Sequence, residues 1–147
     1  MLKAVFDANL LISAFLSRDN PRGASSELMR LVISGALELY LSVEIIDEAI
    51  EVLGDSRRLR ARYDYSLQQV GQYHADLLTL ATVLDGPAPV SGAVPRDPDD
   101  DKIIACAVAA GADYLVSRDL DLLSLGTYAG IIIIRPEQFL QLVRARP

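Results

Sequence analysis

The strongest constraint on the fold is a run of acids that leads directly into a long uncharged segment. Arg96-Asp97-Pro98-Asp99-Asp100-Asp101-Lys102 places four carboxylates within five positions, and the residues from 103 to 111 carry no charge. Pro98 suits the first turn of a helix, and acids there favour the positive end of the helix dipole. Gly111 is a natural C-terminal stop. A helix that is apolar on every side is buried on every side, so its acidic start must emerge from the core.

Two further segments combine a short apolar strand with an acid. The stretches from Lys3 to Asn9 and from Asp113 to Asp119 each predict such a strand, followed by Asp7 and Asp119. In an open parallel sheet, ligands bind beyond the carboxyl ends of the strands, so we expect these acids to share one crevice with the start of the buried helix. Carboxylates about 5 Å apart repel each other by roughly 3 kcal/mol when the effective dielectric constant is about 20. A divalent cation relieves that repulsion, and the pattern therefore predicts a Mg²⁺ or Mn²⁺ site.

Strands alternate with helices along the rest of the chain. The pattern predicts further strands at 37–41 and 130–134, the second fully buried, and helices at 10–16, 24–34, 43–53, 66–81 and 137–144. Residues 82–95 have the composition of a loop, and Ser42 is a plausible N-cap. The alternation favours an α/β fold, a three-layer α/β/α, Rossmann-like arrangement with a central parallel sheet. From a length of 147 residues we expect one domain spanning 1–147.

The overall composition excludes several classes of protein. The net charge of −6 argues against broad electrostatic binding to a polyanion, although local basic patches can still contact nucleic acid. Cys106 is the single cysteine, which excludes an internal disulfide and suits a reducing compartment. No apolar run approaches the roughly 20 residues that span a bilayer, and the N-terminus lacks a signal-peptide pattern. We expect a cytoplasmic protein without a membrane association.

The residue types also exclude several kinds of catalysis. His74 is the single histidine, and Cys106 lies midway along the predicted buried helix, so neither a Ser-His nor a Cys-His couple is credible. The chain contains no Gly-Lys-Ser/Thr phosphate loop and no Gly-x-Gly-x-x-Gly after its first strand. Zinc prefers cysteine or histidine ligands, whereas carboxylates suit Mg²⁺ and Mn²⁺.

Two charged clusters remain open to two interpretations each. Helix 43–53 carries acids on one face, at positions Glu44, Asp47, Glu48 and Glu51. They form either an ordinary solvated face or a face from which one acid joins the cation site. Residues 55–62 contain the densest basic cluster, Arg57, Arg58, Arg60 and Arg62. That cluster is either a solvated helix surface or a patch that contacts phosphates.

Three motifs resemble those of PIN-domain nucleases. The segment Val5-Phe6-Asp7-Ala8-Asn9-Leu10-Leu11-Ile12-Ser13 is similar to the opening motif of the family. Residues 96–102 together with 111–123 resemble its C-terminal half. The closest branch consists of small single-domain toxins of toxin–antitoxin pairs, and the resemblance spans nearly the whole chain.

The resemblance implies a set of site residues. The four family acids that hold the metal and act in catalysis fall on Asp7, Glu48, Asp100 and Asp119, with Glu44, Asp47 and Glu51 as alternatives to Glu48. Asn9 and Ser13 match polar residues near the first acid, and Ser117 takes the position of a Thr or Ser that helps to orient the site. Asp121 matches a further acid that lies near the metal in some members. Asp97, Asp99 and Asp101 are assigned to the helix N-terminus instead.

The same resemblance implies a function. The expected reaction is Mg²⁺- or Mn²⁺-dependent hydrolysis of RNA phosphodiester bonds that leaves 5′-phosphate and 3′-hydroxyl ends. Candidate phosphate contacts are Arg96, Arg118, Arg57 and Arg58. The expected partners are an RNA substrate, a cognate antitoxin protein and a second copy of the chain.

Two alternatives compete with this function. One is a catalytically inactive PIN-like module that binds RNA or a partner protein. The other is an aspartyl-phosphate receiver or phosphatase on a similar sheet, which requires a lysine beside the acids. Lys102, on the predicted buried helix, is poorly placed for that role.

Overall fold

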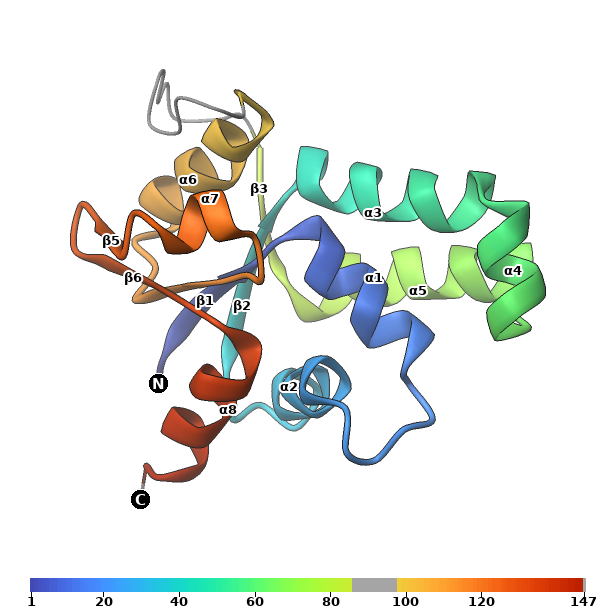
Figure 1. Cartoon of the computed structure of the whole chain (residues 1–147), viewed down its shortest axis with the longest axis horizontal. Coiled ribbons are helices and arrows are strands. Elements are labelled where there is room, and N and C mark those ends of the chain that lie inside the picture. Colours follow the sequence, from blue (N-terminus) through green and yellow to red (C-terminus); the bar gives the residue numbers. More distant parts are fainter. Residues whose placement is uncertain (86–97, 147) are drawn as a thin grey trace.

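The chain alternates between strands and helices, as the sequence pattern predicts (Figure 1). The structure is a computed structural model that describes residues 1–85 and 98–146, without the side chains of residues 98–100. Its strands are β1 (Lys3–Phe6), β2 (Glu38–Ser42), β3 (Thr82–Leu84), β4 (Tyr114–Val116), β5 (Thr127–Tyr128) and β6 (Ile131–Ile134). Its helices are α1 (Ala8–Leu16), α2 (Ala24–Ile33), α3 (Val43–Asp55), α4 (Arg57–Tyr63), α5 (Leu67–Leu80), α6 (Pro98–Ala110), α7 (Leu120–Leu123) and α8 (Pro136–Arg144).

One sheet organises the described residues. Its six strands follow the order β3-β2-β1-β4-β6-β5, and all neighbours are parallel except β5 and β6. The predicted central parallel sheet is confirmed, and the antiparallel edge strand β5 is an addition that the sequence pattern did not predict. Because β1, β2, β3, β4 and β6 run in the same direction, their C-terminal ends meet at one edge, which we call the carboxyl edge.

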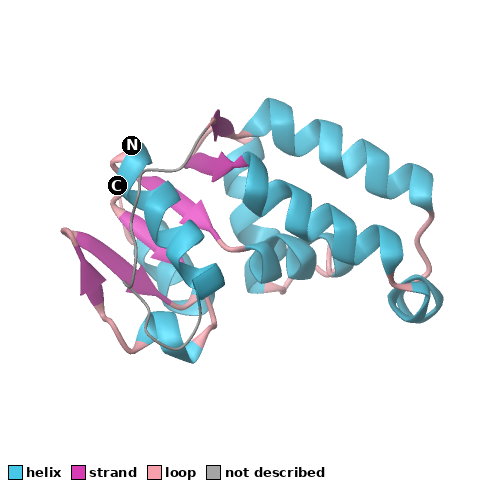
Figure 2. Cartoon of the chain, turned by 90° about the horizontal axis from the view of Figure 1, so that it is seen from above, coloured by secondary structure: helices cyan, strands magenta, loops and turns pink. Residues whose placement is uncertain are grey.

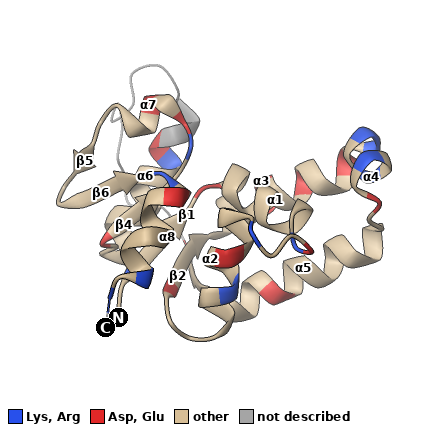
Figure 3. Ribbon diagram, turned by 60° about the horizontal axis from the view of Figure 1, so that its bottom comes forward, with Lys and Arg blue, Asp and Glu red and all other residues tan. Residues whose placement is uncertain are grey.

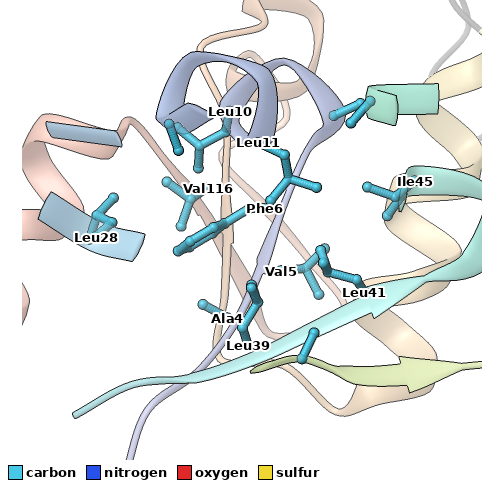
Figure 4. Packing of buried hydrophobic residues seen from close by; sticks show 14 of the residues in the cluster. Ala4, Val5, Phe6, Leu10, Leu11, Leu28, Leu39, Leu41, Ile45 and Val116 are labelled. Carbon is cyan, nitrogen blue, oxygen red and sulfur yellow. The ribbon is translucent and has the colours of Figure 1, made fainter. Parts of the chain in front are cut away.

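Helices cover both faces of the sheet and complete a three-layer α/β/α fold. Helix α6 packs across β1, β2, β3 and β4, while α2 packs against α8. Figure 4 shows Leu28 of α2 beside Phe6 and Val116, on the side of β1 opposite to Ile45. Phe6 and the adjacent Val5 point to opposite faces of the sheet, as consecutive strand residues do, and both are fully buried. The central strand β1 is therefore covered from both sides.

A second group of helices extends away from the sheet. We call α3, α4 and α5 the helical arm, because α3 packs against both α4 and α5. Figures 1 and 2 show the arm projecting beyond the β3 side of the sheet, with α4 at its far end. None of the helices in the described ranges combines the length and the apolar character required to cross a membrane.

Several predicted helix boundaries are confirmed by capping contacts. The Ser42 hydroxyl accepts a hydrogen bond from the backbone N–H of Ile45, 3.2 Å away, and so caps α3. Helix α6 begins at Pro98 and ends before Gly111, whose φ of 61° is left-handed. The backbone N–H of Ala112 then donates to the carbonyl of Ala107 at 3.0 Å, as in a glycine-terminated helix.

Two predictions of burial are wrong. Strand β6 is not fully buried, because Ile132 is 42% exposed while Ile131 and Ile133 point into the core. Its exposure alternates with a period of two, as in a strand with only one covered face. Helix α6 is buried over residues 103–107, but Ala109 and Lys102 are exposed. Lys102 lies at the surface and forms an ion pair with Glu44 of α3, with 3.4 Å between the charged atoms.

Candidate active site

Asp7 stands at the carboxyl edge, at the junction between β1 and α1. Its side chain caps α1 by accepting a hydrogen bond from the backbone N–H of Leu10 at 2.8 Å. The carboxylate is only 4% exposed, which is unusual for an acid that forms no ion pair within the described residues. This position follows from the sequence, because Asp7 stands between the last residue of the apolar strand, Phe6, and the first residue of the helix, Ala8.

The loop after β4 brings Asp119 to the same place. Strand β4 pairs directly with β1, so the residues that follow the two strands are neighbours. Ser117 is fully buried, and its hydroxyl donates to Oδ2 of Asp7 at 2.5 Å. The hydroxyl oxygen of Ser117 in turn accepts a hydrogen bond from the backbone N–H of Asp119 at 2.9 Å. Ser117 thus connects the two acids that the sequence predicts to meet.

The Asp119 side chain also shapes the start of α7. Its Oδ1 accepts hydrogen bonds from the backbone N–H groups of Asp121, at 2.8 Å, and Leu122, at 3.4 Å. The side chain is therefore fixed as the N-cap of α7. Asp121 lies within this turn and contacts the Asp119 carboxylate through its own backbone N–H.

Burial is the main influence on the charge of Asp7. Desolvation raises the pKa of this carboxyl group above its ordinary value, and the negative charge of Asp119 raises it further. The hydrogen bonds from Ser117 and Leu10 and the positive charge of Arg118 act in the opposite direction, but the net shift is upward. A buried carboxylate beside another acid is in a state that a cation would stabilise.

A small cavity opens beside these acids. It has a volume of about 180 Å³ and is lined by Asp7, Asn9, Leu10, Arg118 and Asp119. We call it the Asp7 cavity. Arg118 belongs to the lining, and its positive charge acts on Asp7. The cavity thus combines oxygen ligands suited to a hard cation with a group suited to a phosphate.

The donor chemistry fits a Mg²⁺ or Mn²⁺ ion, although the described acids do not complete a site. No group of three or more acidic, histidine or cysteine side chains within metal-binding range occurs in the described part of the chain. The predicted third acid, Asp100, is in the first turn of α6, but its side chain lies outside the described residues. Asp7 and Asp119 are the members of the predicted set that the structure brings together through one serine.

Glu48 occupies a different position from Asp7 and Asp119. It is exposed on α3 and lines a groove of about 330 Å³ between α3 and α6. The groove is also lined by the three alternatives to Glu48, which are Glu44, Asp47 and Glu51, and by Lys102. Glu48 is not among the residues that line the Asp7 cavity. The ion pair between Lys102 and Glu44 brings the first turns of α6 and α3 together at the carboxyl edge.

The remaining predicted residues are spread over several elements. Asn9 is exposed at the Asp7 cavity, and Ser13 lies one turn further along α1 and is half-buried. Arg57 and Arg58 are exposed on α4, at the far end of the helical arm from the sheet (Figures 1 and 3). Arg96 lies outside the described residues, as does Asp97.

Two residues that contact Arg118 were not predicted from the sequence. Glu137 of α8 and Ser25 of α2 both contact the guanidinium of Arg118. Burial raises the pKa of Glu137, but the hydrogen bonds and charge of Arg118 outweigh it, so the net pKa lies below its ordinary value. The available signal was an acid three residues after the end of β6, but it becomes informative only once β6 is known to lie beside β4.

Comparison with known proteins identifies one family, and the similar solved structures include the two described here. A family model described as PIN domain matches residues 3–121. The crystal structure of PAE2754 from Pyrobaculum aerophilum has a TM-score of 0.61 and 19% sequence identity, covering 99% of this chain and 91% of that chain. VapBC2 from Rickettsia felis, bound to a DNA fragment from their promoter, has a TM-score of 0.61 and 14% identity, covering 91% of this chain and 98% of that chain. No curated protein sequence matches the chain.

Proposed function

This chain belongs to the PIN-domain family, and from that premise we propose that it is a metal-dependent endoribonuclease. The observation that carries the proposal is the pair of acids Asp7 and Asp119, joined by the buried Ser117 at the carboxyl edge of a parallel sheet. Binding at this edge is the rule for open α/β sheets. Because the sequence offers neither a Ser-His nor a Cys-His couple, we assign the catalytic role to the carboxylates.

Mg²⁺ or Mn²⁺ is the proposed cofactor, since PIN domains generally use divalent ions. Asp7 and Asp119 would hold the ion, with Asp100 and Glu48 as the further proposed ligands. Such an ion stabilises negative charge on phosphoryl oxygens and activates water as a nucleophile.

Hydrogen bonds from neighbouring residues of the chain fix the side chains of both acids. Ser117 and the backbone N–H of Leu10 each occupy one oxygen of Asp7, which fixes the plane of the carboxylate. The backbone N–H groups at the start of α7 fix Asp119 through its Oδ1. Both acids are thus held by hydrogen bonds to rigid elements, which supports the proposal that these two side chains bind a cation with little reorganisation.

We propose RNA as the substrate and a protein antitoxin as the partner. The likeness to VapBC2 supports the partner, and the family resemblance supports RNA. The exposed acids Asp47 and Glu51 on α3, beside Glu48, form a surface on which an arginine-bearing antitoxin segment can act. A homodimer stays a prediction from the family resemblance, and the treatment of residues 1–147 as one domain stays a prediction from the chain length.

The experiment uses purified protein and a panel of single-stranded and structured RNAs. Cleavage should require Mn²⁺ or Mg²⁺, stop in the presence of EDTA and leave 5′-phosphate ends. Asp7→Asn and Asp119→Asn should each lower the cleavage rate by at least about a hundredfold. Asp113→Asn is the matched control, since Asp113 precedes β4 at the opposite edge of the sheet and accepts a hydrogen bond from the backbone N–H of Lys3.

Two results would count against the proposal. Cleavage that persists at the wild-type rate in Asp7→Asn would point to a contaminating nuclease. RNA binding without cleavage in any divalent ion, and without a calorimetric signal for Mn²⁺, would favour the inactive PIN-like module instead.

A further inference from the structure

Three elements that are distant in the sequence meet at the guanidinium of Arg118. Its Nε and Nη2 both donate to Oε1 of Glu137, at 3.2 Å and 2.6 Å, and Nη2 and Oε1 also form an ion pair. Its Nη1 donates to the hydroxyl of Ser25 at 3.2 Å. Arg118 lies in the loop after β4, Glu137 in the first turn of α8 and Ser25 in the first turn of α2. Three of the guanidinium's five N–H groups therefore have partners outside the Asp7 cavity.

The topology of the sheet explains why Glu137 reaches Arg118. Strands β4 and β6 are parallel neighbours, and the backbone N–H of Ser117 donates to the carbonyl of Ile134 at 3.0 Å. The loop after β4 and the start of α8 therefore leave the carboxyl edge side by side. Ser25 completes the arrangement because α2 packs against α8 and buries this hydroxyl group.

The negative charges of Asp7 and Asp119 offer the Arg118 guanidinium an alternative position. Arg118 lines the same cavity as Asp7 and Asp119, and its positive charge acts on Asp7. An arginine without its own acid would pair with those two carboxylates, because charge-assisted bonds of this kind are the strongest available to it. The guanidinium would then compete with a cation for the carboxylates and would be unavailable to bind a phosphate. Glu137 supplies an acid on the other side of the guanidinium.

We propose that Glu137 is a positioning residue, which with Ser25 holds the Arg118 guanidinium at the mouth of the Asp7 cavity, where it binds a phosphate of the RNA. The inference rests on the proposed function for the identity of the ligand. Glu137 lies beyond residues 3–121, the part of the chain that the family model matches, so the family match does not assign it this role.

The sign of the expected effect separates positioning from simple electrostatics. Glu137→Gln removes a negative charge next to an RNA site, and Coulomb's law alone predicts tighter binding of the polyanion. Positioning predicts weaker binding, because the guanidinium loses its strongest anchor. The ion pair between Arg144 and Glu27 provides a matched control: it also joins α8 to α2, but lines a separate groove with Arg30 and Leu140. Glu27→Gln changes the net charge equally without touching Arg118.

The experiment measures RNA binding apart from cleavage. Fluorescence anisotropy of a labelled single-stranded RNA is recorded in the Asp7→Asn background with Mn²⁺, for Arg118→Gln, Glu137→Gln, the double variant and Glu27→Gln. We expect Kd to rise about tenfold in Arg118→Gln and at least about threefold in Glu137→Gln. The double variant should match Arg118→Gln, and Glu27→Gln should stay within about twofold of its parent. In Arg118→Gln, the slope of log affinity against log salt should shrink by about 0.7, the value for one phosphate contact on a single strand.

Three outcomes would overturn the inference. Unchanged or tighter binding in Glu137→Gln would leave only the electrostatic effect. If Glu137→Gln weakened RNA binding by the same factor in the Arg118→Gln background, Glu137 would act independently of Arg118. An equal loss in Glu27→Gln would assign the effect to the packing of α2 on α8. The predicted binding pattern in a protein that never cleaves RNA would uphold this inference while refuting the proposed nuclease.

Discussion

Replacing Asp7 with asparagine separates a metal-binding role from a structural one. Asparagine caps helices as well as aspartate does, so its carbonyl oxygen keeps the bond from the backbone of Leu10. Its amide group meets the Ser117 hydroxyl, which must then accept rather than donate, a change that costs about 1 kcal/mol. The variant also removes a buried charge whose pKa is raised by desolvation. Because these effects oppose each other, we expect the metal-free variant to be within about 1 kcal/mol of the wild type.

The response to Mn²⁺ should differ far more. A ligand at a hundred times its Kd stabilises the folded state by about 2.7 kcal/mol. For a domain of this size, each kcal/mol raises Tm by about 2–4 °C, so the wild type should gain about 5–10 °C. The Asp7→Asn variant should gain almost nothing, whereas Asp113→Asn, at the opposite edge of the sheet, should respond like the wild type.

The assay is thermal unfolding followed by circular dichroism, with and without Mn²⁺, beside isothermal titration calorimetry. An equal Mn²⁺ shift in wild type and Asp7→Asn would refute the assignment of Asp7 as a ligand. A loss of more than about 3 kcal/mol in the metal-free variant would show that the ionised carboxylate is needed for folding itself, as for a buried pair broken on one side.

Three further measurements test the charge of Asp7 and other parts of the site. In metal-free buffer, we compare the free energy of unfolding in urea of the wild type with that of Asp7→Asn. The wild-type value minus the variant value should fall as the pH rises from about 4 through the raised pKa of Asp7, because the folded state binds this proton more tightly than the unfolded state. Ser117→Ala should lower stability by about 1–3 kcal/mol, measured by urea unfolding, and weaken Mn²⁺ binding by about tenfold in calorimetry, since both acids lose their shared partner. Glu48→Gln should reduce Mn²⁺-dependent RNA cleavage by at least about a hundredfold, whereas Glu51→Gln should change it less than about threefold.

Each of these expectations has a contrary result. A stability difference that stays flat between pH 4 and 8 would mean that Asp7 titrates alike in the folded and unfolded chain. Normal Mn²⁺ affinity in Ser117→Ala would show that the two acids hold their positions independently. Equal losses in Glu48→Gln and Glu51→Gln would assign the effect to the charge of the α3 surface rather than to one ligand.

The fold was largely predictable because its signals are local. Apolar runs such as the one from Val5 to Phe6 and caps such as Ser42 depend on neighbouring residues, and both are confirmed. Strand β5 was missed because two residues, Thr127 and Tyr128, give no periodicity. The exposure of Ile132 was missed because four identical residues carry no alternation, so the covered face is decided by which helices pack on the sheet.

The site was predictable in part for a similar reason. Asp7 and Asp119 each follow a strand, and parallel pairing of β1 with β4 is enough to bring them together. The contact between Arg118 and Glu137 depends instead on the strand order, which places β6 beside β4. Nothing within either segment specifies that neighbour. The same limit applies to Glu48, whose face of α3 depends on how the helical arm packs against α6.

The most direct test of the account is to locate a metal ion in the protein. Crystals soaked in Mn²⁺ and measured at a wavelength with anomalous scattering from manganese would show its position without reference to activity. We predict a peak in the Asp7 cavity, with oxygens of Asp7 and Asp119 about 2.0–2.3 Å from the ion and Asp100 completing the protein ligands. Manganese bound only elsewhere, with the Asp7 cavity empty at saturating concentration, would contradict the claim that these acids converge to hold a divalent ion.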